Sequence, residues 1–184
     1  MIVCLGDSLT YGYGVPHYDC WVSISKNFSN TKIINKGLNG DTTSGMLFRI
    51  YETAILLNPS HIFVMGGTND FLLNRPVDKV FSNMKCIIKD IFKHKIIPIV
   101  GIQIPVHKDM AEKYWEASID YDEVNNKIQI YRDLLLNYCT INNIKFFDFF
   151  KLYKNSRILN DLLYTDGIHP SKEGHKIMSK IVNF

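Results

Sequence analysis

Three side chains suited to acyl-transfer chemistry occur in short polar motifs near the two ends of the chain. Ser8 lies in Gly-Asp-Ser-Leu-Thr directly after an apolar run, and Asp166 and His169 lie in Asp-Gly-Ile-His-Pro. A serine hydroxyl becomes an effective nucleophile only when a base removes its proton. An imidazole does this best when a carboxylate holds its second ring N–H. Ser8 is therefore the candidate nucleophile, His169 the candidate base and Asp166 the candidate acid.

Two further polar segments could supply hydrogen-bond donors to a negatively charged oxygen. Residues 35–43 are rich in glycine and could present backbone N–H groups, and residues 66–70, Gly-Gly-Thr-Asn-Asp, could present the Asn69 amide. Acyl transfer needs such donors, since removing one typically lowers the rate by about 10²–10³. Taken singly, each motif is as typical of a turn or a helix cap. Together they predict an oxyanion hole beside Ser8.

The ordered set of motifs resembles the GDSL, or SGNH, hydrolase family, and spans nearly the whole chain. By this resemblance the nucleophile is Ser8, and Asp166 and His169 are the acid and base. The oxyanion hole would comprise the backbone N–H of Ser8 together with Gly40, in Asn-Gly-Asp-Thr-Thr, and Asn69. The resemblance also implies a flavodoxin-like α/β/α fold, no metal, no organic cofactor and a small-molecule ester as substrate.

The same resemblance implies a serine hydrolase that cleaves a carboxylic ester through an acyl-enzyme. Family members include esterases, lipases, lysophospholipases, thioesterases and carbohydrate deacetylases. We therefore expect a short-chain acyl ester, an acetylated sugar or a lysophospholipid-type substrate, with a thioesterase of the same fold as an alternative. Activity is expected to fall at acidic pH, because a protonated His169 cannot accept the Ser8 proton.

Two other classes of protein compete with this interpretation. A flavodoxin-like module could bind a nucleotide or phosphate at the same loops, but the chain lacks a Walker A motif and a complete dinucleotide fingerprint. A metal-assisted hydrolase could use nearby acidic, histidine and cysteine side chains, but no HExxH or paired Cys/His spacing is present. Those side chains are Asp7, His17, Asp19, Cys20, Asp70, Asp166 and His169.

The elements that must position these residues follow from the hydrophobic pattern. Strand-length apolar runs alternate with amphipathic stretches, which is typical of βαβ units around a parallel sheet. Strands are expected at residues 2–5, 32–35, 61–65, 96–102 and 145–148. Apolar spacings of three and four predict helices near residues 46–54, 77–92, 121–138 and 172–182, the last capped by Ser171. Residues 103–120 show no period and are expected to form a long loop or a short lid.

This pattern predicts a three-layer α/β/α sandwich with about five parallel strands, which agrees with the flavodoxin-like fold that the family resemblance implies. Right-handed crossovers place the ligand crevice beyond the carboxyl ends of the strands. Four of the five predicted strand exits lead into unusual segments, including those that carry Ser8, Gly40 and Asn69. The sheet is therefore expected to gather the candidate site at one edge.

Composition excludes several other classes. The chain has 184 residues, 46% apolar and 21% charged, which predicts a single domain over residues 1–184 and excludes a disordered or fibrous protein. The net charge is only +3, and lysines outnumber arginines, so nucleic acid is not an expected partner. No apolar run approaches the ~20 residues of a membrane span. The N-terminal residues lack the features of a secretory signal, and a cytoplasmic location is expected.

Several other residues are assigned structural roles. The four cysteines lack CxxC spacing and are expected to be reduced core or near-core residues, at positions 4, 20, 86 and 139. Histidines other than His169 are expected at the surface or at strand edges, with His107 the one that follows a strand towards the site. Tyr11, Tyr13 and Trp115 could line an acyl or alcohol pocket, but they stay outside the candidate site, because aromatic side chains near a crevice are as often packing. None of these features specifies an oligomeric state.

Overall fold

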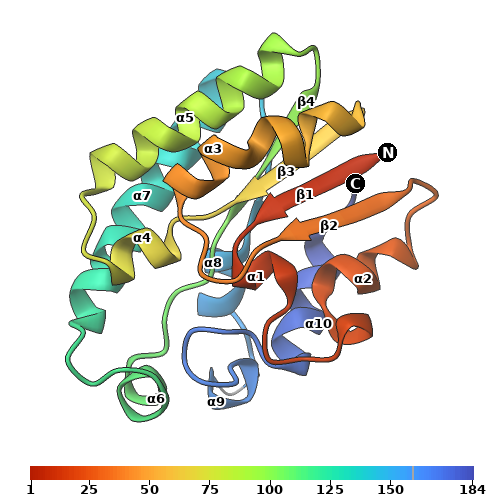
Figure 1. The fold of residues 1–184 in the computed structure, drawn as a ribbon. Helices are drawn as coiled ribbons and strands as arrows, with labels where there is room; N and C mark the ends of the chain where they lie inside the picture. Colours follow the sequence, from red (N-terminus) through yellow and green to blue (C-terminus); the bar gives the residue numbers. More distant parts are fainter. Residues whose placement is uncertain (159) are drawn as a thin grey trace.

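A computed structural model describes residues 1–158 and 160–184 and shows a sheet between two layers of helices (Figure 1). The strands are β1 (Ile2–Gly6), β2 (Ile33–Gly37), β3 (His61–Met65), β4 (Ile97–Ile102) and β5 (Lys145–Asp148). They are all parallel and lie in the order β2-β1-β3-β4-β5. The predicted three-layer α/β/α fold is confirmed.

Helices cover both faces of the sheet. One layer contains α3 (Thr43–Thr53), α5 (Val77–Lys93) and α7 (Tyr121–Ile141), and the other contains α2 (Trp21–Lys26), α8 (Phe149–Lys154) and α10 (Lys172–Ile181). Side chains alternate along each strand, so Val3 and Leu5 of β1 join one core while Ile2 and Cys4 join the other. Because both faces of the central strands β1, β3 and β4 are buried, these strands are mostly apolar runs in the sequence.

Shorter helices connect the main elements, mostly near the carboxyl ends of the strands (Figure 1). They are α1 (Ser8–Tyr11), α4 (Thr68–Leu72), α6 (Lys108–Tyr114) and α9 (Asn160–Leu163), with 3-10 turns η1 (His17–Asp19) and η2 (Ile55–Leu57). The prediction of a loop or lid over residues 103–120 was incomplete, because α6 forms there. This helix buries only Ala111, so it lacks the apolar period that marks α5 and α7.

The burial of two side chains differs from expectation. Cys86 is exposed on α5, whereas the other three cysteines are buried, and all four are free thiols among the described residues. His175 of α10 is fully buried rather than at the surface, and its Nδ1 accepts the Trp21 N–H at 3.4 Å. Burial, aided by the nearby charge of His169, lowers the pKa of His175 to about 4, and the charge of Asp19 opposes this shift.

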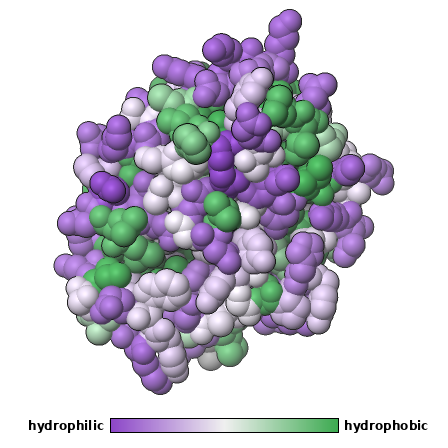
Figure 2. Space-filling model, viewed as in Figure 1, coloured by the Kyte–Doolittle hydropathy of each residue, from purple (hydrophilic) through white to green (hydrophobic). Residues whose placement is uncertain are grey.

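The surface shows no continuous apolar face in the view of Figure 2, where hydrophobic groups form separate patches among hydrophilic ones. Within residues 1–158 and 160–184, no helix combines the length and the hydropathy needed to cross a bilayer.

The strand order locates the expected ligand site. It places a topological switch point between β1 and β3, and ligands bind outside the carboxyl ends of the strands at such points. The segments that leave β1 and β3 carry Ser8 and Asn69.

Candidate active site

Ser8 lies at the junction of β1 and α1, where a buried strand turns directly into a short helix. The Asp7 carboxyl group caps this helix, since its Oδ1 accepts the Leu9 N–H at 2.9 Å. Ser8 is 5% exposed, so only a small part of the residue is open to solvent. The local sequence therefore places a hydroxyl at the switch point on a short, capped turn.

Ser8, His169 and Asp166 form one chain of hydrogen bonds. Ser8 Oγ lies 2.9 Å from His169 Nε2, and His169 Nδ1 lies 2.7 Å from Asp166 Oδ2. The other oxygen, Asp166 Oδ1, accepts the backbone N–H of Ile168 at 2.9 Å and of His169 at 2.8 Å. The carboxylate thereby fixes the imidazole through both the ring and the backbone of the same loop.

The electrostatics of Asp166 suit a carboxylate that stays ionised. Partial burial on its own would raise the pKa of Asp166. Hydrogen bonds from the His169 ring, the His169 N–H and the Ile168 N–H outweigh burial and hold this pKa below its ordinary value. An ionised Asp166 favours a proton on Nδ1, which leaves Nε2 free to accept the Ser8 proton.

The loop that carries Asp166 and His169, the acid–base loop, packs against α6. Gly167 has φ +92°, and a Cβ there would lie 2.3 Å from the Ala111 nitrogen, so only glycine fits against this helix. The His107 N–H donates to the Gly167 carbonyl at 2.7 Å, and His107 Nε2 lies 2.9 Å from Asp161 Oδ1. His107 therefore follows β4 towards the site as expected, but it contacts the loop backbone rather than the Ser8 hydroxyl.

The two candidate oxyanion segments form a second group of contacts. Gly40 is exposed with φ +75°, a conformation that favours glycine. Asn69 Nδ2 donates to the Asp41 carbonyl at 2.9 Å, and because an amide nitrogen carries two hydrogens, one remains for another acceptor. Asp70 accepts from both the N–H and the hydroxyl of Thr43, at 2.8 and 3.0 Å. These bonds tie the exits of β2 and β3 together.

Arg49 is a positioning residue that the sequence interpretation missed. From α3 it donates to Asp41 Oδ2 at 2.7 Å, to the Lys36 carbonyl at 3.0 Å and to the Gly6 carbonyl at 3.0 Å. It therefore joins the ends of β1 and β2 to the segment that carries Gly40. An arginine on the predicted helix at 46–54, in a lysine-rich chain, was the available signal.

Tyr13 and Trp115, which the sequence interpretation left out, both pack against the candidate base. The Tyr13 ring centroid lies 4.5 Å from that of His169, and the Trp115 centroid lies 5.3 Å from it. Neither motif nor spacing marked these residues, because Trp115 is more than fifty residues from His169 in sequence and reaches it only through the docking of α6.

Asp7 is a buried carboxyl group directly before the candidate nucleophile. It is 0% exposed, and its Oδ2 has no hydrogen-bond partner within the described residues. Burial raises the pKa of Asp7 to about 7, and the carboxylates of Asp41 and Asp70 add to this effect, while the Leu9 N–H opposes it. Asp7 therefore holds its proton to much higher pH than an exposed aspartate.

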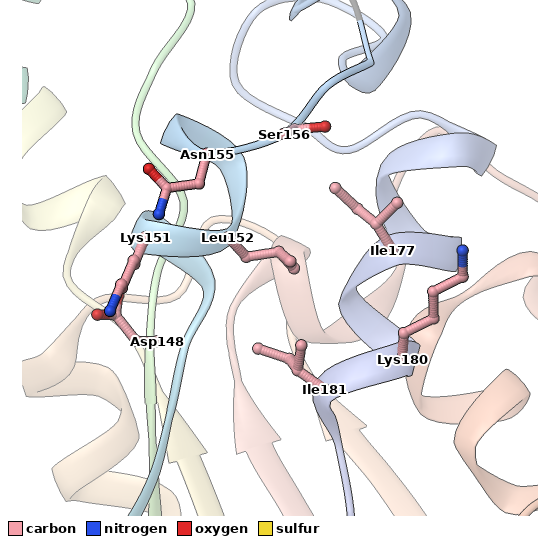
Figure 3. A pocket seen from close by; sticks show the side chains of 8 residues that line it. All are labelled: Asp148, Lys151, Leu152, Asn155, Ser156, Ile177, Lys180 and Ile181. Carbon is pink, nitrogen blue, oxygen red and sulfur yellow. The ribbon is translucent and has the colours of Figure 1, made fainter.

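A separate apolar groove of about 380 Å³ lies between α8 and α10. In Figure 3, Leu152, Ile177 and Ile181 point into the space between the two helices, with Lys151 and Lys180 at its edges. None of the residues that line the groove belongs to the candidate site.

In the described part of the chain, no group of three or more His, Cys, Asp or Glu side chains is arranged to hold a metal ion.

The fold and the site together define a doubly wound α/β protein with a serine, a histidine and an aspartate hydrogen-bonded at its switch point. The chain belongs to the GDSL-like lipase/acylhydrolase family, whose model matches residues 4–177. A crystal structure of a lipolytic G-D-S-L family member from Veillonella parvula is similar, with a TM-score of 0.84 and 27% identity. That similarity covers 97% of this chain and 93% of the other.

Two curated proteins are also similar in sequence. An arylesterase of Vibrio mimicus is 27% identical over 124 residues, 65% of this chain, and the match spans only 62% of its own length. The "Thioesterase 1/protease 1/lysophospholipase L1" of Escherichia coli strain K12 is 24% identical over 180 residues, covering 97% of this chain and 79% of that protein.

Proposed function

We propose that this protein is a serine hydrolase that cleaves carboxylic esters through an acyl-enzyme. The observation that carries the proposal is the hydrogen bond of 2.9 Å between Ser8 Oγ and His169 Nε2, with Asp166 Oδ2 2.7 Å from Nδ1. A nucleophile, a base and an orienting carboxylate in hydrogen-bond contact are the parts that activate a serine. Family membership and the esterase and thioesterase names of the relatives support the same reaction class.

The proposed reaction has two halves. Ser8 Oγ attacks the ester carbonyl while His169 Nε2 takes its proton, and Asp166 stabilises the resulting imidazolium. The carbonyl oxygen, now negative, accepts hydrogen bonds from the backbone N–H of Ser8 and Gly40 and from the free N–H of Asn69. The C–O bond to the alcohol then breaks, and His169 returns the proton to the departing oxygen. Water attacks the acyl-enzyme in the second half, again with His169 as base.

For the substrate, we propose a range of ester classes rather than a single compound. Short-chain acyl esters, acetylated sugars and single-chain lysophospholipids are compatible with the site, and thioesters use the same groups because the nucleophile and the donors act on the acyl carbonyl. A series of p-nitrophenyl esters of increasing acyl length, assayed beside acetylated sugars and acyl-CoA, separates these classes. No step requires a metal or an organic cofactor.

The test is the Ser8→Ala variant. It should lose esterase turnover and labelling by a fluorophosphonate probe, because both require the Ser8 hydroxyl, while its circular dichroism spectrum should stay that of the wild type. Ser82→Ala, which removes an exposed hydroxyl on α5, is the matched control and should keep both activities. Turnover retained in Ser8→Ala would refute the assignment.

A further inference from the structure

Two half-exposed aromatic rings border the candidate base, and neither takes part in the hydrogen-bonded chain. Tyr13 is 42% and Trp115 49% exposed, whereas His169 is 4% exposed. Their centroids lie 4.5 and 5.3 Å from that of the imidazole. A ligand group that reaches His169 therefore meets the free surfaces of these rings. Exposed aromatic surface beside a buried reactive group is a feature that packing alone does not require.

Both rings are fixed to segments that carry site residues. The backbone N–H of Tyr13 donates to the carbonyl of Ser8 itself, at 3.1 Å. The N–H of Trp115 donates to the carbonyl of Ala111 at 2.9 Å, and Ala111 is the residue against which Gly167 packs. The position of the Tyr13 ring is thus fixed by a bond to the residue that bears the candidate nucleophile. The position of the Trp115 ring is fixed by α6, the helix that packs against the acid–base loop.

In the proposed reaction, the leaving group occupies the space beside His169 that Tyr13 and Trp115 border. His169 Nε2 must return a proton to the departing alcohol oxygen, so that oxygen has to come within about 2.6–3.2 Å of Nε2. The carbonyl oxygen instead faces the donors of Gly40 and Asn69, which belong to the exits of β2 and β3. The alcohol portion of the ester, rather than its acyl chain, must therefore lie against the two rings beside His169.

We propose that Tyr13 and Trp115 form a leaving-group subsite that selects esters of planar aromatic alcohols. Aromatic rings pair in offset or edge-to-face arrangements with centroids about 4.5–7 Å apart, and the attraction exceeds that of simple area burial. A saturated ring of the same size presents no π face, so it gains only the free energy of burying apolar surface area. The inference rests on the proposed function and adds to it which part of the substrate these side chains recognise.

The test compares benzyl acetate with cyclohexylmethyl acetate. The two esters share the acyl group, the ring size and a primary alcohol of similar acidity, so they differ mainly in the planarity of the ring. In the wild type, kcat/KM should favour benzyl acetate by about three- to ten-fold. Trp115→Leu and Tyr13→Leu should each bring this ratio towards one, and Trp115→Phe, which keeps a planar ring, should retain most of it.

Each variant has a matched control in an adjacent aromatic side chain. Tyr114 is 56% exposed on α6 directly before Trp115, and Tyr11 is 50% exposed at the end of α1, two residues before Tyr13. Neither ring packs against His169 in the described structure. Tyr114→Leu and Tyr11→Leu should therefore leave the benzyl preference unchanged.

Besides equal hydrolysis of the two acetates by the wild type, three outcomes would overturn the inference. The first is that both leucine variants keep the wild-type ratio of kcat/KM for benzyl acetate to that for cyclohexylmethyl acetate. The second is that the variants change the preference between acetate and butyrate esters without changing this ratio, which would place the two rings at the acyl chain. Should a leucine variant fail to fold, inhibition of the wild type by the free alcohols decides. Benzyl alcohol should compete more strongly than cyclohexylmethanol, and equal inhibition is the third contrary outcome.

Failure of the leaving-group inference differs from failure of the proposed function. An enzyme that hydrolyses both acetates equally, and whose Ser8 reacts with a fluorophosphonate, is still a serine hydrolase but has no aromatic leaving-group subsite. A protein that hydrolyses neither ester and whose Ser8 is not labelled refutes both proposals together.

Discussion

Asp7→Asn tests whether the carboxyl group before the candidate nucleophile is protonated in the folded protein. The side chain is 0% exposed, Oδ1 accepts the Leu9 N–H, and Oδ2 has no partner among the described residues. Asparagine keeps the acceptor oxygen in the capping position and replaces only the unpartnered oxygen. The substitution therefore removes the ionisation of Asp7 while it keeps the shape and the cap.

The magnitude follows from the shift of the Asp7 pKa. Burial raises it from 3.8 to about 7, which corresponds to about 4 kcal/mol against the ionised form in the folded state. Because the folded pKa is the higher one, the contribution to stability is complete below the unfolded pKa and is lost as pH rises through 7. Between pH 5 and pH 8 the wild type should lose about 2.5 kcal/mol that the variant keeps.

Urea unfolding followed by tryptophan fluorescence at pH 5, 6, 7 and 8, at constant ionic strength, gives the free energy of unfolding of both proteins. Titrating groups that do not interact with Asp7 are shared, so their effects cancel in the difference between variant and wild type. That difference should rise in favour of Asp7→Asn by about 2.5 kcal/mol over this range. Asp78→Asn removes an exposed carboxylate on α5 and should give a flat difference.

A flat difference for Asp7→Asn, within about 0.5 kcal/mol, would refute the reasoning. It would mean that Asp7 ionises in the fold as it does in the unfolded chain, and hence that Oδ2 is hydrated or hydrogen-bonded in solution. The ester hydrolysis rate serves as a second readout. It should be largely retained in Asp7→Asn, because the Leu9 N–H keeps its acceptor and the turn that carries Ser8 keeps its cap.

Three further predictions concern other parts of the site and the core. Asn69→Ala should lower kcat by about 10²–10³ with little change in KM, because the donor acts on the charged oxygen that develops during reaction. Gly167→Ala should cost about 2–4 kcal/mol in urea unfolding and also lower kcat, since its Cβ would lie 2.3 Å from the Ala111 nitrogen at φ +92°. His175→Asn should reduce acid sensitivity: the folded pKa of His175 is lowered from 6.5 to about 4, so protonation on acidification favours unfolding. The wild type should therefore lose about 2 kcal/mol more than this variant between pH 7 and pH 5.

Each of these predictions has a comparison that could contradict it. A decrease in kcat of less than about five-fold in Asn69→Ala would remove this amide from the oxyanion hole. Gly14 has φ +83°, but a Cβ there would make only ordinary van der Waals contacts with Thr165, the nearest at 3.5 Å, so Gly14→Ala should cost only about 1 kcal/mol. An equal cost at both glycines would show that the contact with α6 is unimportant. Parallel pH curves for His175→Asn and the wild type would mean that the buried imidazole is protonated without penalty.

Much of the fold was predictable because its signals are local. The apolar runs of β1 to β5 and the stripes of α5 and α7 are properties of consecutive residues, and all five strands were located to within two residues at each end. The helix α6 was missed because it buries only Ala111 and carries no stripe. His175 and Cys86 were misplaced because the burial of a single side chain depends on its neighbours in other elements.

The amino-acid sequence alone determined which residues are candidates for the proposed chemistry, since Ser8, Asp166 and His169 are recognisable by type and motif, and the parallel sheet that follows from the strand pattern is expected to put their loops at one edge. What the sequence did not contain is which distant side chains surround the imidazole. Arg49, Tyr13 and Trp115 reach the site through the docking of helices, and Asp7 acquires its raised pKa only when neighbouring elements remove its water. Such effects depend on distances between segments far apart in the chain, and only the tertiary structure sets those distances.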